Sequence, residues 1–242
     1  MRAMALKASG VGTAAGQGRE PDLLARWVYA ACLVLFPLLW GVVAGTDLHP
    51  EPVGETAAEQ VRAVADAAGA WQQVHLVLAG AGLLGVGAVL GLRSLVSRRG
   101  RLSVVASVGA GLGIAAAGLV AGLVLTEAVL VAPVARACSE TSACLSQANE
   151  QFLAAFADAS WNDLTALSVA AGTLIFALGT LAVLAWMAKS VRAWEAALMV
   201  VGIVGIYATN TVLHGNAKYG LLLVLVASAS IALRMVRRTS HG

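Results

Sequence analysis

Six long apolar runs dominate the sequence and restrict its fold more than any other feature. An α-helix needs about 20 apolar residues to cross the roughly 30 Å hydrocarbon core of a bilayer. Each run meets this length, so the sequence predicts an all-α fold, a polytopic membrane bundle of six transmembrane helices. The runs are Trp27–Gly45, Gln72–Leu92, Leu102–Pro133, Asp163–Met187, Trp194–Leu213 and Tyr219–Met235.

The third run is longer than one crossing requires, so we expect it to tilt or to continue above the hydrocarbon. Together the runs define a six-helix membrane domain over residues 27–236. Residues 1–26, which contain several glycines, are expected to form a flexible cytoplasmic tail, and residues 237–242 a second, short cytoplasmic tail.

The composition excludes the main soluble classes of protein. Charged residues make up 12% of the chain and hydrophobic residues 59%, and the mean hydropathy is +0.82. Soluble domains carry about 25% charged residues, so this chain has too few charges to solvate the surface of a globule of its length. A soluble enzyme, a nucleic-acid-binding domain and a disordered protein are therefore excluded. The lipid bilayer is the first expected partner.

The basic residues predict the orientation in the membrane. Of the 16 Lys and Arg residues, 13 lie before the first run, at or beyond the end of the last run, or in the loops that follow the second and fourth runs. Only Arg62, Arg136 and Lys218 lie on the other side. Because cytoplasmic loops carry the excess of Lys and Arg, we expect a multi-pass protein of the cell membrane with both termini cytoplasmic.

Two longer loops face outward in this topology, and both contain helical patterns. In the first, Ala57, Val61, Val64 and Ala68 recur at helical spacing. This spacing predicts a short amphipathic helix that lies on the membrane surface or over the bundle. In the second loop we expect a similar helix over Leu145–Ala157.

Cys138 and Cys144 are the two cysteines of the second outer loop. An oxidising outer compartment favours a disulfide between them. A metal pair is the alternative, but no His lies nearby and the spacing is wrong for zinc. Cys32 lies within the first run among apolar neighbours and is expected to be inert packing.

Glycines recur four residues apart in several runs. This spacing places two glycines on one helix face, where a neighbouring backbone can approach closely. Packing within the bundle is the main interpretation, and a homodimer through these faces is the alternative. The pairs are Gly41/Gly45, Gly87/Gly91, Gly109/Gly113 and Gly118/Gly122.

Ionisable side chains inside a membrane are costly unless they are paired or wetted, so each one is a candidate functional residue. Few are present, and four of them lie at similar depth in four different helices. Whether they converge laterally is left open by the sequence. They are His75, Glu127, Asp163 and His214, with Asn210 one turn deeper. Trp71 and Trp161 lie at nearby helix ends, where we expect them to anchor the chain at the membrane interface, as we do for Trp27 and Trp194.

Glu127 has the most apolar surroundings of these residues, because its neighbours other than Thr126 are apolar on every face. Loss of hydration there favours the neutral acid near pH 7. A neutral carboxyl can donate a proton, carry one, or hydrogen-bond a ligand. A structural pair with His75 or His214 is the alternative. In an enzyme, Glu127 or Asp163 would be the acid and His75 the base.

In a binding site, four other residues are candidate ligand contacts: His214, Asn210, Trp161 and Trp71. Two histidines at similar depth on separate helices also suit a haem. No other feature supports a haem, and we expect neither a cofactor nor a metal.

The chain resembles small six-span membrane proteins of high-GC bacteria. Four segments carry the resemblance: Trp71–His75, the Arg-rich Arg93–Arg101, Thr126–Val131, and the glycine-containing Gly172–Leu181. The resemblance implies a fold and a membrane location, and it implies no activity.

Three functions are compatible with these sequence features. The first is a membrane protein that binds a lipid, an isoprenoid or another hydrophobic small molecule at a polar site in the outer half of the bilayer. The second is a membrane-embedded acid–base enzyme, cyclase- or isomerase-like, that acts on a hydrophobic substrate. The third is a small proton-linked exporter or immunity-type protein. No GxxxxGK[ST], HExxH, CxxC or GxSxG motif points elsewhere.

Overall fold

The computed structural model describes residues 23–45, 52–96, 100–146, 149–159, 165–212 and 217–237, and within them it contains helices and no strand. The helices are α1 (Leu23–Gly45), α2 (Ala57–Asp66), α3 (Ala68–Ser94), α4 (Arg101–Thr126), a π-helical turn η1 (Glu127–Val131), α5 (Ala132–Ser139), α6 (Glu150–Ala157), α7 (Thr165–Met187), α8 (Ala193–Val212) and α9 (Ala217–Arg237). The predicted all-α fold is confirmed.

Six of the described helices close into a ring. In order around the ring, α1 packs against α3, α3 against α4, α4 against α7, α7 against α8, α8 against α9, and α9 against α1. Five of them are long and apolar enough to cross a membrane, and α8 contributes a shorter apolar stretch, Ala193–Tyr207. The ring is therefore a polytopic membrane bundle, and a crossing by α8 stays a prediction.

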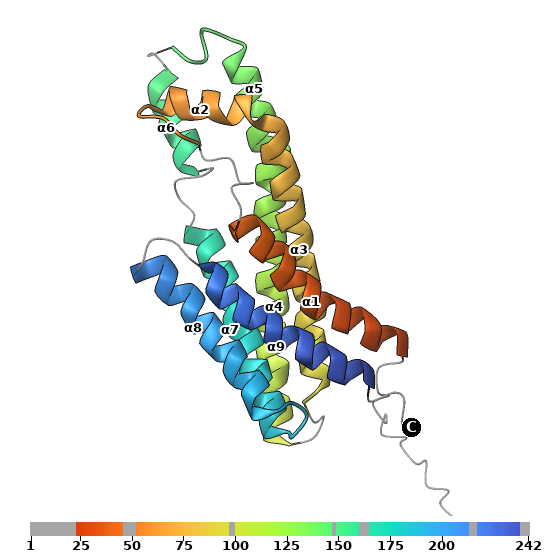
Figure 1. Ribbon diagram of the computed structural model, residues 1–242. Coiled ribbons are helices and arrows are strands. Elements are labelled where there is room, and N and C mark those ends of the chain that lie inside the picture. Colours follow the sequence, from red (N-terminus) through yellow and green to blue (C-terminus); the bar gives the residue numbers. More distant parts are fainter. Residues whose placement is uncertain are drawn as a thin grey trace, which may run out of the picture.

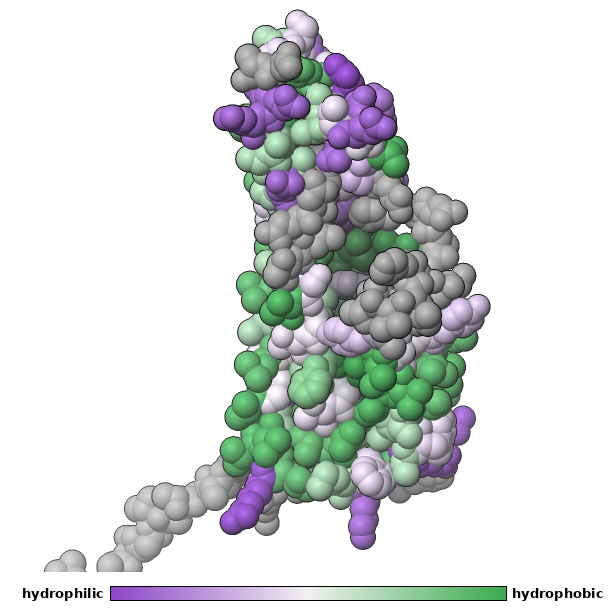
Figure 2. Space-filling view, turned by 90° about the vertical axis from the view of Figure 1, so that its left-hand side faces the viewer, coloured by the Kyte–Doolittle hydropathy of each residue, from purple (hydrophilic) through white to green (hydrophobic). Residues whose placement is uncertain are grey.

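The surface of the molecule agrees with this description. Apolar side chains cover most of the visible face of the ring, whereas the most hydrophilic side chains gather at the two ends of the molecule (Figure 2). We call the end with Arg93, Arg101 and Arg234 the basic end. The first described residue, Leu23, and the last, Arg237, both lie at this end, opposite α2, α5 and α6 (Figure 1).

The third apolar run continues well beyond one crossing, as predicted. From Arg101 to Ser139 the chain is helical over 39 residues, which spans about 58 Å at 1.5 Å per residue. The π-helical turn η1 interrupts the α-helix just before Pro133. Pro133 lacks an N–H and its ring would clash with the carbonyl four residues back, so the wider turn has a cause in the sequence.

A small helical layer, which we call the cap, covers the far end of the α3–α4 pair. It consists of α2, α5 and α6, with α2 lying across the end of α3 (Figure 1). The cap has its own apolar core, which includes Val61, Val64, Ala135 and Leu153. The predicted amphipathic helix is thus confirmed as a helix over the bundle.

Local signals explain how the cap helices begin and end. Thr56 and Glu59 form a capping box, in which the Thr56 hydroxyl accepts from the Glu59 N–H and the Glu59 carboxylate accepts from the Thr56 N–H. The predicted disulfide joins Cys138 and Cys144. It closes the turns that follow α5, and α6 begins only at Glu150, five residues later than the sequence predicted.

Glycines allow close packing at several seams of the ring. A Cβ at Gly82 would lie 3.0 Å from the backbone nitrogen of Ala121, and one at Gly113 would lie 3.0 Å from the Ala177 side chain. Gly87 and Gly91 face Cys32 and Tyr29 of α1 in the same way, which confirms packing within the bundle for this pair. Gly109, Gly118 and Gly122 face no atom within 4 Å.

Candidate functional site

His75 and Glu127 are in direct contact. His75 lies two turns into α3, and Glu127 is the first residue of η1. The His75 Nε2 atom is 2.9 Å from Glu127 Oε2, and the two side chains are 3% and 16% exposed. Two of the four residues predicted at similar depth therefore form one pair between neighbouring helices.

The orientation of the imidazole is fixed on both sides. His75 Nδ1 lies 2.8 Å from the backbone carbonyl oxygen of Trp71, and the Trp71 ring stacks on the imidazole with centroids 4.5 Å apart. A carbonyl oxygen can only accept, so Nδ1 carries a hydrogen. The Nε2–Oε2 contact then holds one further proton. The pair is neutral overall, whether it exists as imidazolium and carboxylate or as imidazole and carboxylic acid.

The pair lies between two apolar clusters. Toward the cap, Trp71 and Val131 belong to the cap core. Toward the basic end, Ala79 and Val124 belong to a small cluster that Trp40 and Leu167 help to cover. The His75–Glu127 pair thus lies between the cap core and this smaller cluster.

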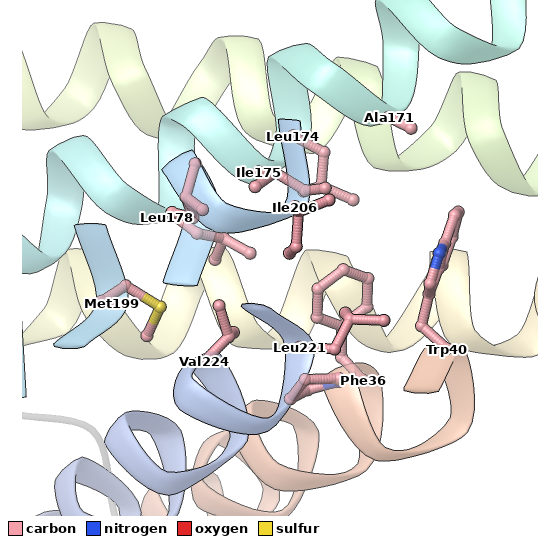
Figure 3. A pocket seen from close by; sticks show the side chains of 12 residues that line it. Phe36, Trp40, Ala171, Leu174, Ile175, Leu178, Met199, Ile206, Leu221 and Val224 are labelled. Carbon is pink, nitrogen blue, oxygen red and sulfur yellow. The ribbon is translucent and has the colours of Figure 1, made fainter. Parts of the chain in front are cut away.

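An apolar pocket lies inside the ring, between α1, α7, α8 and α9. Its volume is about 20 Å³, much less than the roughly 300–1,000 Å³ of ordinary small-molecule sites, so a ligand would enter only if the lining side chains moved apart. Figure 3 shows Trp40 at one end of the pocket and Met199 at the other. Its lining is apolar: Phe36, Pro37, Trp40, Ala171, Leu174, Ile175, Leu178, Met199, Ile203, Ile206, Leu221 and Val224.

The pocket and the His75–Glu127 pair are linked by shared neighbours. Trp40 and Ala171 line the pocket and also pack against the cluster that contains Ala79 and Val124. His75 lies one helical turn beyond Ala79, and Glu127 lies three residues beyond Val124. The cluster that Trp40 covers is therefore about one helical turn from the pair along α3.

The other predicted site residues stand as follows. Asp163, Trp161 and His214 lie outside the described residues, and Asn210 belongs to α8 but its side chain is not described. Trp71 is 1% exposed, so our expectation that it anchors the chain at the membrane interface is wrong. It is buried because α2, η1 and α5 cover it.

Sequence reasoning missed the pocket. Phe36, Leu174 and Ile203 have the same apolar character as ordinary core residues, and only the lateral arrangement of four helices leaves space between them. The position of Trp40 was a usable sequence signal. Trp27 and Trp194 lie at the ends of apolar runs, whereas Trp40 lies inside one.

A second buried carboxylate lies at the basic end. Glu195 of α8 is fully buried, and its Oε1 atom accepts from Ser230 Oγ at 2.7 Å and from Arg234 Nη2 at 3.1 Å. Its Oε2 atom accepts from the Arg192 N–H at 2.7 Å. Every carboxylate oxygen is thus bonded, and Glu195 joins α8 to α9 while capping the start of α8.

No cluster of three or more potential metal ligands occurs in the part of the chain that the structure describes. Both ring nitrogens of His75 are engaged, so ligation of a haem iron would require the pair to break. In comparisons with models of protein families, with curated proteins and with solved structures, no match to this chain was found.

Proposed function

We propose that this membrane protein binds a hydrophobic small molecule with one long apolar chain, of the lipid or isoprenoid class. The chain of the ligand occupies the pocket inside the ring, and its polar end lies near the His75–Glu127 pair. The protein resides in the cell membrane with the basic end cytoplasmic and the cap outside. The charge asymmetry of the loops supports this orientation, and so does the Cys138–Cys144 disulfide, which suits an oxidising compartment.

The apolar pocket is the observation that carries the proposal. Twelve residues line it, all of them apolar or aromatic. Its volume of about 20 Å³ is too small for a hydrocarbon chain, so binding requires the lining side chains to move apart, and the separated apolar surfaces then regain dispersion contacts with the hydrocarbon. A polar or charged molecule would lose its hydration there without compensation.

The His75–Glu127 pair gives the site one polar end. A hydroxyl or an ester oxygen at the end of the ligand can exchange hydrogen bonds with the 16% exposed Glu127 carboxyl. The pair is otherwise enclosed by apolar groups, so the polar end of the ligand must be small and uncharged.

A second candidate function is acid–base catalysis on the same ligand class. The observation that favours it is the fixed imidazole, which is held by the Trp71 carbonyl and shares one proton with Glu127. A held proton donor and acceptor next to an apolar pocket suits protonation or isomerisation of an apolar substrate. Conversion of the bound compound by wild type, and its accumulation unchanged in Glu127→Gln, would identify this function.

Mass spectrometry of bound molecules tests the proposal. The full chain is purified in mild detergent, and small molecules are extracted from wild type, Ala171→Phe and Val169→Phe. Ala171 lines the pocket, so the larger ring fills it. Val169 is 65% exposed on the same helix and serves as the matched control for a Phe on the lipid-facing side.

We expect one apolar compound to be enriched in wild type and in Val169→Phe, and to be lost from Ala171→Phe. Glu127→Gln should retain the compound at reduced occupancy, because the pocket is intact and one polar contact is weakened. Equal amounts of the same bulk lipids in all four proteins would contradict the proposal, since those lipids would then belong to the outer surface of the bundle.

A further inference from the structure

A groove runs along the outer side of the ring between α7 and α8. Its volume is about 310 Å³, at the lower end of the range of ordinary small-molecule sites. Phe176 and Val204 line it and are both more exposed than buried, so the groove opens toward lipid. The α7–α8 seam is the least extensive contact between neighbours in the ring, which leaves this space between the two helices. The lining consists of Phe176, Gly179, Thr180, Val183, Leu184, Val200, Ile203 and Val204.

The groove is a surface site that does not need the pocket inside the ring. Ile203 lines both spaces and lies between them. A Cβ built on Gly179 would lie 2.8 Å from Ile203 Cδ1, so the lack of a side chain at Gly179 makes room for the tip of Ile203 in the floor of the groove. Apart from Thr180 the lining is apolar, and it therefore suits a hydrocarbon chain.

The groove lies close to the basic end. The Glu195–Arg234 ion pair joins the start of α8 to the end of α9, so the turn between α7 and α8 lies at this end. Leu184 and Phe176 precede Lys189 of that turn by five and 13 residues, which places the groove about 8–20 Å from Lys189 along α7. One leaflet contributes about 15 Å of hydrocarbon. The groove thus lies at the depth of acyl chains when the turn lies among headgroups.

Two tryptophans mark the depth of this turn. Trp186 near the end of α7 and Trp194 at the start of α8 are both exposed, one on either side of the turn. Trp is enriched at the level where the hydrocarbon meets the headgroups. The turn between these two residues is therefore expected at the headgroup level of the leaflet at the basic end.

Lys189 and Arg192 give the turn two positive charges. Neither side chain forms an ion pair with another residue that the structure describes. Glu195, the carboxylate nearest to them in the sequence, already accepts from Ser230 and Arg234. Both cations are thus available to an anion outside the protein. A lipid phosphate is the anion at this depth, and a guanidinium can hold it through two parallel hydrogen bonds.

The backbone at Lys189 supports a role for its side chain. Lys189 has a φ of 57°, and it alone has a positive φ among the described residues other than glycine. Its N–H donates to the Trp186 carbonyl at 2.8 Å, and the Ser190 N–H donates to the Ala185 carbonyl at 2.9 Å, so this left-handed residue ends α7. Glycine is usual at such a position because a Cβ is unfavourable there. Lys189 bears this conformational cost and supplies an ammonium group that a glycine would lack.

We propose that the groove and the α7–α8 turn together bind one anionic phospholipid of the leaflet at the basic end. The headgroup phosphate contacts Lys189 and Arg192, and one acyl chain lies in the groove. A lipid rather than a soluble anion is the occupant, because the two cations lie beside an apolar groove at the depth of acyl chains. The site is separate from the pocket inside the ring, so this inference does not rest on the proposed function.

Native mass spectrometry of the delipidated full chain tests the site. The protein in mild detergent is titrated with phosphatidylglycerol and, separately, with phosphatidylcholine that carries the same acyl chains. The dissociation constant of the first bound lipid is measured in each case. We expect phosphatidylglycerol to bind several-fold more tightly, because only its headgroup has a net negative charge. Inorganic phosphate at the same concentration should not displace it, since phosphate has no chain to fill the groove.

Three charge variants examine the headgroup contact. Lys189→Gly and Arg192→Gln each remove one positive charge from the turn, and each should weaken phosphatidylglycerol binding several-fold while phosphatidylcholine binding stays unchanged. Glycine favours the left-handed backbone of position 189, so the melting temperature of Lys189→Gly should not fall. Arg26→Gln is the control. It removes one charge from α1, which lies opposite α7 in the ring, and should bind both lipids as wild type does.

Two tryptophan substitutions on α8 examine the acyl-chain contact. Val204 lines the groove, so Val204→Trp fills it and should weaken the binding of both lipids several-fold. Val201 is 56% exposed on the same helix and lies outside the lining, so Val201→Trp is the matched control and should bind as wild type does. Both positions are on the surface, and equal melting temperatures confirm that both variants are folded.

Several results would overturn the site. Equal affinity of wild type for the two lipids would contradict the headgroup contact. Equal loss of phosphatidylglycerol binding in Lys189→Gly and Arg26→Gln would show only an effect of net charge. Unchanged binding in Val204→Trp, or displacement of the lipid by inorganic phosphate, would show that no chain occupies the groove. None of these measurements depends on the pocket inside the ring, so the site and the proposed function succeed or fail separately.

Discussion

The cap and helix α4 of the membrane bundle bury different kinds of side chain. In α4 the inward positions carry small residues, such as Ala106, Ala110 and Gly113, while large ones, such as Val108 and Leu119, face outward. The cap has the reverse arrangement. Its large apolar side chains Val61, Val64, Trp71 and Leu153 are buried, and charged residues such as Glu59 and Arg62 face outward.

The difference follows from the solvent. In lipid there is no hydrophobic gain from bringing two helices together, so association depends on close backbone approach and good packing. In water the burial of large apolar side chains supplies the main driving force. The small inward residues of α4 and the large buried residues of the cap fit these two solutions, and the cap core meets a neighbouring apolar cluster at His75 and Glu127. The substitutions below act on one region and leave the other unchanged.

The largest effect is expected from Trp71→Ala in the cap. Truncation of a fully buried aromatic side chain costs about 3–5 kcal/mol, and this Trp is the largest buried residue of the cap core. Amide hydrogen exchange should accelerate in α2, α5 and α6 while α8 and α9 stay protected. Trp186→Ala, at a lipid-facing position of α7, should change exchange little anywhere. Equal loss of protection in α8 and α9 would show that the cap and the bundle unfold as one unit.

The next effect concerns the disulfide. Replacement of both Cys138 and Cys144 by Ala removes a short cross-link, which typically costs about 2–3 kcal/mol for a loop of this size. The loss should appear in the thermal unfolding of the cap alone. Cys32 is a buried free cysteine in the bundle. As a control, Cys32→Ala should leave the thermal unfolding of the cap unchanged. A shift of both transitions by the double variant would contradict the separation of the two cores.

A pair of glycine substitutions examines the packing of the bundle. Gly82→Ala places a Cβ about 3.0 Å from the Ala121 backbone, and such overpacking costs about 1–3 kcal/mol. Gly118→Ala meets nothing within 4 Å and should be neutral or stabilising by about 0.5–1 kcal/mol, because Ala favours a helix. The measurement is the melting temperature in detergent. Destabilisation by Gly118→Ala with a change in mass would indicate a second copy on this face.

The smallest effect is a pH dependence of α2. The N–H groups of Thr56 and Glu55 bond the Glu59 carboxylate and hold the pKa of Glu59 below its ordinary value. Because this pKa is lowered in the folded protein, its contribution to stability is present above about pH 4.3, the ordinary Glu value, and is lost as the pH falls through the lowered value. Glu59→Gln keeps the capping box and should remove this dependence from the melting of the cap. An unchanged dependence would assign it to another carboxylate.

Sequence reasoning predicted the elements of this molecule better than their lateral arrangement. Apolar length predicted the five helices that are long enough to span a membrane, helical spacing predicted α2, and compartment chemistry predicted the disulfide. Depth along each helix placed His75 and Glu127 at one level, but only the packing of α3 on α4 shows that they touch. The pocket depends on the positions of four helices around one axis, and no local pattern encodes that arrangement.

The continuous helical path through α4, η1 and α5 carries the cap at the end of a long lever. Its 39 residues are about twice the number that one crossing of the hydrocarbon core needs. A tilt of only a few degrees where α4 is held between α3 and α7 therefore displaces the cap by a few ångströms. Conversely, any molecule that pulls on the cap applies its torque to α4 inside the membrane. The π-helical turn that begins at Glu127 follows the part of α4 that is held between α3 and α7, so bending of the long helix is concentrated near this turn.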